Sequence, residues 1–240
     1  MARRSIWGQV RVATCVVADS ALWSWWQAKA VLPRTAPRRW CAGDGATVVL
    51  VPGLATNWQF LRPVGDALSR AGFRVRVFPQ LRRMGRSENE LANMLRRFLE
   101  SHREWGPVAL VTHSKGGLVA KRVMLDDPDG RLVAGAVTIA APFHGAVAAR
   151  FVRGEFRSLR HVTDLRPGTP SVLELARRTE VNSRIVTISP IVDEIVGRRG
   201  PLPGARNFAV SAIGHNRLLA LPRVQQLVVR ETHRLMQRAP

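Results

Sequence analysis

The sequence predicts an α/β protein, a three-layer αβα sandwich around a mainly parallel sheet of about six strands. Short apolar runs such as residues 46–52 (ATVVLVP) alternate along the chain with segments of helical apolar spacing. Such runs are typical of strands that are buried on both faces of a parallel sheet. Residues 108–125 (VALVTHSKGGLVAKRVML) also place a serine and two glycines between one such run and a helical segment. Open α/β sheets carry their sites at strand ends of this kind.

The predicted elements follow one another in a regular order after residue 45. Strands are expected at residues 46–52, 73–79, 107–112, 132–142, 184–189 and 206–212. Helices are expected at residues 58–72, 88–104, 117–125, 170–179 and 222–237. The helix at 88–104 has acidic residues near its start and arginines later, as the helix dipole favours. Strands that alternate with helices at this spacing indicate a sheet covered by helices on both faces.

Length and charge limit the class of protein. A chain of 240 residues, 46% of them hydrophobic, is long enough for one substantial domain. Its formal net charge is +20, and nearly all of the basic residues are arginines. Such a field attracts anionic surfaces, but the arginines are scattered and no nucleic-acid-binding motif accompanies them. We therefore predict no specific nucleic-acid partner. Cys15 and Cys41 form neither a disulfide framework nor a metal-binding pattern.

Residues 1–41 are predicted to form a Trp- and Arg-rich segment ahead of the α/β domain at 42–240. Arg11 and Asp19 interrupt the apolar stretch that a secretion signal needs. In a membrane-spanning helix, Asp19 would cost roughly 2.5–3.5 kcal/mol at the bilayer centre. Two interpretations stay equally open, a helix lying on an anionic membrane surface and a helix packed on the domain. A cytoplasmic or peripheral membrane location is favoured, with a spanning anchor or an atypical signal as further alternatives.

The serine in residues 108–125 has the surroundings of a catalytic nucleophile. Small residues stand two positions before and two positions after it, in the pattern Thr112-x-Ser114-x-Gly116. A sharp strand-to-helix turn needs small residues there, and it exposes the serine hydroxyl at the carboxyl edge of the sheet. The pattern therefore predicts that Ser114 is a nucleophile.

A serine nucleophile needs a base and an acid that orients the base. In this architecture both follow the serine, the acid first, on loops after later strands. The fifth predicted strand is followed by Asp193 and Glu194, and the sixth by His215. We predict Asp193 as the acid and His215 as the base. Glu194 is the alternative acid, and His144, after the fourth strand, is the alternative base.

Two backbone N–H groups are predicted to form the oxyanion hole. One belongs to Lys115, the residue after the nucleophile, and the other to Leu54, in the loop after the first strand. Gly53 permits the sharp turn there, and Pro52 has no N–H to give. The charged side chain of Lys115 is expected to point to solvent.

Several ordered stretches together resemble the α/β-hydrolase superfamily, in particular the small bacterial lipases and esterases of the class 2 lipase type. They are VVLVPGLATNWQFLRPVGDALSRAGFRVRV, THSKGG and PLPGARNFAVSAIGHNRLLALPRV. The resemblance covers roughly residues 46–238. It implies an α/β-hydrolase fold, a Ser114–Asp193–His215 triad, and hydrolysis of small-molecule or lipid-like carboxylic esters without a metal or organic cofactor.

The resemblance leaves two functional alternatives open. The same triad could pass the acyl group to an alcohol or thiol, which would make the protein an acyltransferase. A non-catalytic binding protein on a hydrolase fold is the other alternative, because Pro52 replaces the usual His and Thr112 the usual Gly or Ala. Residues 141–183 contain one clear helical pattern, so we expect no large lid and an open acyl groove.

Overall fold

A six-stranded sheet forms the centre of the computed structural model, which describes residues 6–30, 35–78, 86–152, 160–197 and 200–238. The strand order is β2-β1-β3-β4-β5-β6, and every neighbouring pair is parallel. The strands are β1 (Thr47–Val51), β2 (Arg74–Val77), β3 (Val108–His113), β4 (Val133–Ile139), β5 (Ile185–Val192) and β6 (Arg206–Ile213). The predicted sheet of about six mainly parallel strands is confirmed.

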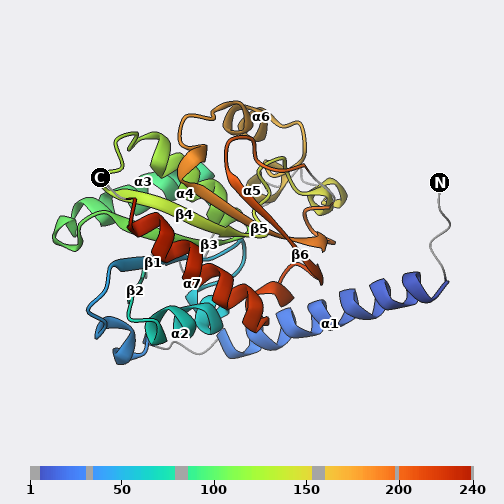
Figure 1. Ribbon diagram of the computed structural model, residues 1–240. Helices are drawn as coiled ribbons and strands as arrows, with labels where there is room; N and C mark the ends of the chain where they lie inside the picture. Colours follow the sequence, from blue (N-terminus) through green and yellow to red (C-terminus); the bar gives the residue numbers. More distant parts are fainter. Residues whose placement is uncertain (1–5, 31–34, 79–85, 153–159, 198–199, 239–240) are drawn as a thin grey trace.

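Helices connect the strands and cover the sheet (Figure 1). The helices of the described residues are α1 (Ile6–Ala30), α2 (Arg62–Arg70), α3 (Glu88–Glu100), α4 (Lys115–Leu125), α5 (Arg160–Thr163), α6 (Pro170–Arg177) and α7 (Pro222–Met236). Helix α3 begins at a capping box, in which Ser87 and Glu90 each bind the other's backbone N–H. Helix α4 begins at Lys115 rather than at the expected Gly117, because the chain enters the helix directly from the serine turn.

The two faces of the sheet are buried by different helices, which gives three layers. Side chains alternate between the faces along each strand. Val49 belongs to a core cluster with the apolar residues of α3 and α4, whereas Leu50 packs with those of α2 and α7. All five residues of β1 are buried, as the continuous apolar run predicts.

Helix α1 contacts β6 and the short helical turn Trp58–Leu61 that follows the loop after β1, and its other end extends past the body of the protein (Figure 1). The Trp26 ring meets the Phe60 ring edge to face, with ring centroids 5.6 Å apart. Gln27 Nε2 donates a hydrogen bond to the carbonyl of Ala55, at 2.6 Å. Within the described residues, no helix combines the length and the apolar character needed to cross a membrane. The boundary between residues 41 and 42 stays a prediction.

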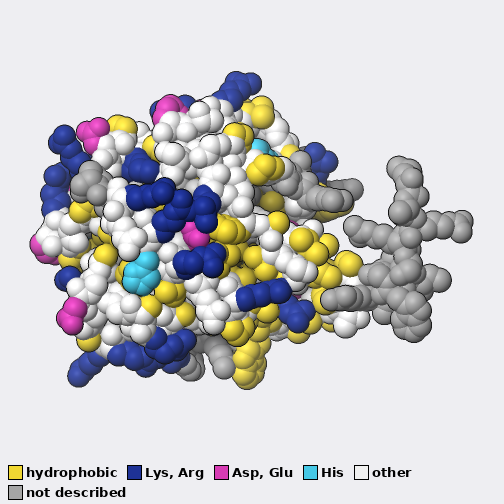
Figure 2. All heavy atoms as spheres, viewed as in Figure 1, with side chains coloured by type: hydrophobic (Ala, Val, Ile, Leu, Met, Phe, Trp, Pro, Cys, Tyr) yellow, Lys and Arg dark blue, Asp and Glu magenta, His cyan; other side chains and the backbone are white. Residues whose placement is uncertain are grey.

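Basic side chains are spread over the face of the molecule in Figure 2, and they do not gather in a single stripe there. Three arginines of the chain surround one acid: Arg206, Arg230 and Arg234 all reach the carboxylate of Glu231, which is buried. Part of the basic excess is thus paired within the fold.

Candidate active site

Ser114 occupies a strained turn between β3 and α4. Its backbone has φ 52° and ψ −127°, a conformation that L-residues other than glycine rarely adopt. The backbone N–H of Ser114 donates to the carbonyl of Ile139 in β4, at 2.8 Å, which ties the turn to the neighbouring strand. Strain of this kind persists only where the surrounding structure fixes it, and it concentrates at functional sites.

The two glycines after Ser114 allow close approach of neighbouring backbone. A Cβ atom at Gly116 would lie 2.5 Å from the carbonyl oxygen of Val51 and 2.6 Å from that of Pro52. A Cβ atom at Gly117 would lie 2.5 Å from the Cβ atom of Ala141. The start of α4 therefore fits against the ends of β1 and β4 only because both positions lack a side chain.

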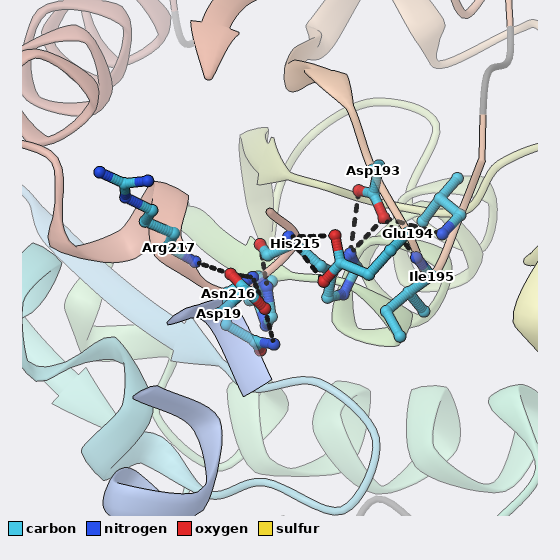
Figure 3. A network of polar contacts seen from close by, with 9 residues as sticks. Asp19, Asp193, Glu194, Ile195, His215, Asn216 and Arg217 are labelled. Atoms are coloured by element: carbon cyan, nitrogen blue, oxygen red, sulfur yellow. Dashed lines mark hydrogen bonds and ion pairs between the residues drawn. The ribbon is translucent and has the colours of Figure 1, made fainter. Parts of the chain in front are cut away.

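The His215 ring is paired with Asp193. The ring atom Nδ1 lies 2.9 Å from Asp193 Oδ2 and 3.1 Å from Oδ1 (Figure 3). Asp193 follows β5, and His215 follows β6, so both stand at the carboxyl edge of the sheet. The backbone N–H groups of Ile195 and Val196 donate to Asp193 Oδ1, at 3.0 and 2.8 Å. These bonds hold the carboxylate in its position beside the ring.

The charges around the pair favour its ionised forms. Burial alone would lower the pKa of His215, but the charge and hydrogen bond of Asp193, assisted by Glu194 and Asp19, raise it above the ordinary value. Burial raises the pKa of Asp193, and this effect is outweighed by His215 and by the two backbone N–H donors, so the pKa lies below its usual range. Asp193 is thus an anion that stabilises positive charge on the ring.

Ser114 and His215 line the same cavity, which has a volume of about 540 Å³. Among the described residues, no hydrogen bond joins the Ser114 hydroxyl to the His215 ring. In enzymes without substrate such bonds are often long and tighten only in the complex. Most of the cavity wall is apolar, with Ala146, Ala149 and Leu165 among its residues.

The alternative acid lies beside His215 but does not bind its ring, and the alternative base lies in another cavity. Both carboxylate oxygens of Glu194 accept from the backbone N–H of His215, at 3.2 Å, while the His215 ring bonds to Asp193. His144 Nε2 lies 3.4 Å from the carbonyl of Pro201 and lines a second cavity, of which Ser114 is not a part. The geometry therefore favours Asp193 over Glu194 and His215 over His144.

The predicted oxyanion residues border the serine from two sides. Leu54 lines the cavity, and its neighbour Gly53 is so close that an added Cβ atom would lie 3.0 Å from Ser114 Cβ. Ala55 continues this loop with φ 54°. Lys115 is the first residue of α4, where backbone N–H groups point toward the N-terminal end of the helix.

The expectation that the Lys115 side chain points to solvent is wrong. This side chain is fully buried between α3 and α4. Its Nζ atom donates to the carbonyl of Arg86, at 2.5 Å, and lies 3.9 Å from the Glu88 carboxylate. Burial lowers the pKa of Lys115. The side chain fixes the start of α3 to the serine turn and does not face the cavity mouth.

The sequence analysis did not predict three residues that the structure places at the site. His113 packs its ring against that of His215, with centroids 4.8 Å apart, and burial lowers its pKa to about 3, so it is neutral. Asp19 and Trp23, both in α1, line the cavity that contains Ser114. The only signal of Asp19 in the sequence is its position as an acid within an apolar, Trp-rich segment.

Among the described residues, no group of three or more His, Cys, Asp or Glu side chains has an arrangement that could hold a metal ion.

Comparison with known proteins identifies the class. Residues 48–233 match the sequence profile of the Alpha/beta hydrolase family. This match covers most of the 240 residues, and the chain belongs to that family. No curated protein sequence matches the chain.

Solved structures show the same fold. Lipase B of Aspergillus fumigatus is 18% identical, with a TM-score of 0.63, and the match covers 82% of this chain and 54% of the lipase chain. The non-haem bromoperoxidase-type protein BpoC of Mycobacterium tuberculosis H37Rv is 17% identical, with a TM-score of 0.60 and coverage of 82% and 94%. A carboxylesterase structure from Nitrososphaera gargenis is 16% identical, with a TM-score of 0.58 and coverage of 81% and 92%. At this identity the likeness concerns the fold.

Proposed function

We propose that the protein is a serine hydrolase that cleaves carboxylic esters through an acyl-enzyme intermediate. One observation carries the proposal. A serine on a strained strand-to-helix turn shares a cavity with a histidine whose far ring nitrogen is paired with a buried aspartate. This is the arrangement of residues that activates a hydroxyl for acyl transfer.

In the proposed reaction, Ser114 Oγ attacks the ester carbonyl carbon while His215 Nε2 takes the hydroxyl proton. Asp193 holds the ring by Nδ1 and stabilises the imidazolium that forms. The tetrahedral intermediate collapses to an acyl-serine when its C–O bond breaks, and His215 gives its proton to the departing alcohol. Water then attacks the acyl-serine with His215 again as base, which releases the acid and restores Ser114.

The negative oxygen of the intermediate needs donors at a fixed place. We assign this role to the backbone N–H groups of Leu54 and Lys115. Gly53 and Ala55 hold the first in the loop after β1, and the start of α4 provides the second. In other enzymes, loss of one such donor costs about 10²–10³ in turnover.

The cavity supports a lipid-like acyl chain as the substrate. Its lining is mainly apolar, and Trp23 and Ile195 belong to it while 38% and 37% exposed, so they reach its rim. Phe151, 83% exposed, stands next to the lining residue Val152. Exposed apolar side chains around an apolar pocket suit an aggregated lipid ester. The basic surface adds attraction to anionic bilayers.

A panel of p-nitrophenyl esters from acetate to palmitate tests the activity and its acyl preference. We expect the full-length protein to hydrolyse them, and Ser114→Ala to lose at least about 10⁴-fold in kcat/KM. His144→Ala, at the alternative base, should stay within about twofold. Equal activity of Ser114→Ala and wild type would contradict the proposal.

The two functional alternatives give different results in the same setting. A non-catalytic protein would not react with a fluorophosphonate probe, whereas an activated Ser114 should be labelled and Ser114→Ala should not. An acyltransferase would form new esters or thioesters when alcohols or thiols compete with water. Binding to vesicles of phosphatidylglycerol but not phosphatidylcholine would support an anionic membrane surface as partner.

A further inference from the structure

Asp19 is a buried acid in the site that the proposed mechanism does not use. It is 1% exposed, although most of the described side chains of α1 are at least partly exposed. Its carboxylate accepts from the backbone N–H groups of Asn216 and Arg217, at 2.9 and 2.6 Å, and from Asn216 Nδ2, at 2.8 Å (Figure 3). A helix from the start of the chain thus supplies an acid to the two residues that follow His215.

Asp19 also lies close to the residue before His215, in the loop that follows β6 (the histidine loop, residues 214–217). Gly214 precedes the histidine and has φ +112°, a conformation that L side chains rarely adopt. A Cβ atom at Gly214 would lie 2.6 Å from Asp19 Oδ1. The loop therefore leaves room for a carboxylate at this place, and Asp19 fills it.

Asp19 completes a pattern that includes Glu194. Glu194 accepts from the backbone N–H of His215, and Asp19 accepts from those of Asn216 and Arg217. Three successive backbone N–H groups thus donate to two side-chain carboxyl groups. Together they fix the backbone that carries the His215 ring.

We propose that Asp19 is a positioning residue for the catalytic base: it anchors the His215 loop to α1 and so sets the direction of the imidazole toward Ser114. The proposal rests on the proposed function, in which His215 is that base. Asp19 does not contact the reacting atoms. It acts on them through the loop.

The same anchor places one wall of the substrate cavity. Ser20, Trp23 and Ser24 line the cavity together with Asp19, and all four lie on α1. The open groove expected from the sequence is thus bounded on one side by this helix. Asp19 links the orientation of the base to the position of that wall.

Asp19 also acts on His215 through its charge. The charged or titratable groups that face His215 are Asp193 and Glu194 from the loop after β5, Asp19 from α1, and the neutral His113 from β3. The negative charge of Asp19 favours the protonated ring and contributes to the raised pKa of His215. Removal of that charge should therefore lower the pKa of His215.

The test compares Asp19→Asn and Asp19→Ala with wild type in the full-length protein. If the ring loses its direction, kcat for p-nitrophenyl butyrate should fall by about 10²-fold in Asp19→Ala and by about tenfold in Asp19→Asn, while KM changes by less than about threefold. The acid limb of the pH profile of Asp19→Asn should move to lower pH. Val17→Ala, an exposed position of the same helix, and Asp129→Asn, an exposed acid far along the chain, are the matched controls.

A purely structural role for Asp19 would lower the thermal midpoint but leave kcat and the acid limb of Asp19→Asn at wild-type values, and this result would overturn the proposal. If Asp19→Ala does not fold, Asp19→Asn decides alone. NMR titration of the His215 ring in wild type and Asp19→Asn needs no ester substrate. An unchanged titration overturns the proposal, and a shift to lower pH supports it. Absence of Ser114-dependent hydrolysis in wild type would instead count against the proposed function.

Discussion

The turns at the amino edge of the sheet place glycine where the backbone is left-handed. Gly72, Gly106 and Gly130, just before β2, β3 and β4, have φ values of +90°, +70° and +74°. The carboxyl edge also has such glycines, Gly214 among them. In addition, it contains every positive-φ residue other than glycine in the described chain: Ala55, Ser114 and Ala140 follow β1, β3 and β4.

The difference teaches where the fold accepts strain. A residue other than glycine in such a conformation lowers the stability of the fold by about 1–3 kcal/mol, and the surrounding structure must hold it there. The amino edge avoids this cost with glycine. The carboxyl edge accepts it at the proposed nucleophile, in the proposed oxyanion loop and in the turn beside them. The strained edge is thus the edge that carries the candidate site.

The largest expected effect separates two buried acids, one at each edge. Asp127, before β4, accepts from the backbone N–H groups of Arg131, Leu132 and Val133, much as Asp193 accepts from its own loop. Only Asp193 also binds His215. Asp193→Asn should lower kcat by about 10⁴-fold, because the imidazole loses its tautomer and its counter-charge. Asp127→Asn should lower the thermal midpoint and leave kcat unchanged. Equal losses of activity would remove the distinction between the edges.

A second prediction concerns added methyl groups. In Gly116→Ala the new Cβ atom meets the backbone carbonyls of Val51 and Pro52, so the serine turn must shift. We expect the free energy of unfolding to fall by about 3 kcal/mol and kcat to fall by about 10²-fold. In Gly72→Ala the new atom has nothing within 4 Å and only the strained φ to bear, about 1–2 kcal/mol. Urea unfolding and ester hydrolysis measure both. Full activity of Gly116→Ala would show that the serine turn can shift without loss of function.

The strain at the serine turn itself should be measurable. Ser114→Gly and Ser114→Ala both lack the hydroxyl and should both be inactive. Only glycine adopts φ 52° without steric cost. In urea unfolding, we expect the free energy of unfolding of Ser114→Gly to exceed that of Ser114→Ala by about 1 kcal/mol. The opposite order would indicate that the turn is not strained.

The smallest effect concerns Glu194. Burial, followed by the charge of Asp19, raises the pKa of Glu194 to about 7. A carboxyl group with a raised pKa favours folding below its unfolded value, and this contribution is lost as the pH rises through the folded value. Glu194→Gln should therefore gain stability relative to wild type between pH 5 and pH 8, by ~1 kcal/mol once solvent screening of this partly exposed group is allowed for.

Thermal midpoints at the two pH values check this prediction, with an expected relative rise of about 2–4 °C for Glu194→Gln. Glu104→Gln, at an exposed position before β3, is the matched control. A difference between Glu194→Gln and wild type that stays the same at both pH values would show that Glu194 does not titrate in this range.

Much of the fold follows from local pattern. The continuous apolar runs of β1 and β3 are buried along their whole length, and period-2 and helical spacing identify the other strands and most of the helices within a few residues. The short helix α5 was not predicted. The positions of Asp193 and His215 after the fifth and sixth strands indicated that both side chains stand at the carboxyl edge, because parallel strands bring their ends together. The catalytic roles of Ser114, Asp193 and His215 stay a proposal.

Two features of the site lay beyond the sequence for a physical reason. The direction of the Lys115 side chain depends on how α3 packs against α4, and Glu88 and Arg86 become its neighbours only through that packing. Asp19 binds Asn216 and Arg217, which lie nearly two hundred positions later in the sequence, and no local periodicity encodes such a contact. Its helix could be read equally well as a membrane-surface helix, since the same tryptophans serve either environment.

The contact between α1 and the histidine loop has a consequence for protein synthesis. The ribosome synthesises Asp19 nearly two hundred residues before Asn216 and Arg217. At about 5–20 residues per second, α1 spends some ten seconds or more without its partners. During this interval the wall formed by Ser20, Trp23 and Ser24 has no anchor at the loop after β6. The proposed activity should therefore arise only after that loop has left the ribosome and has bound α1.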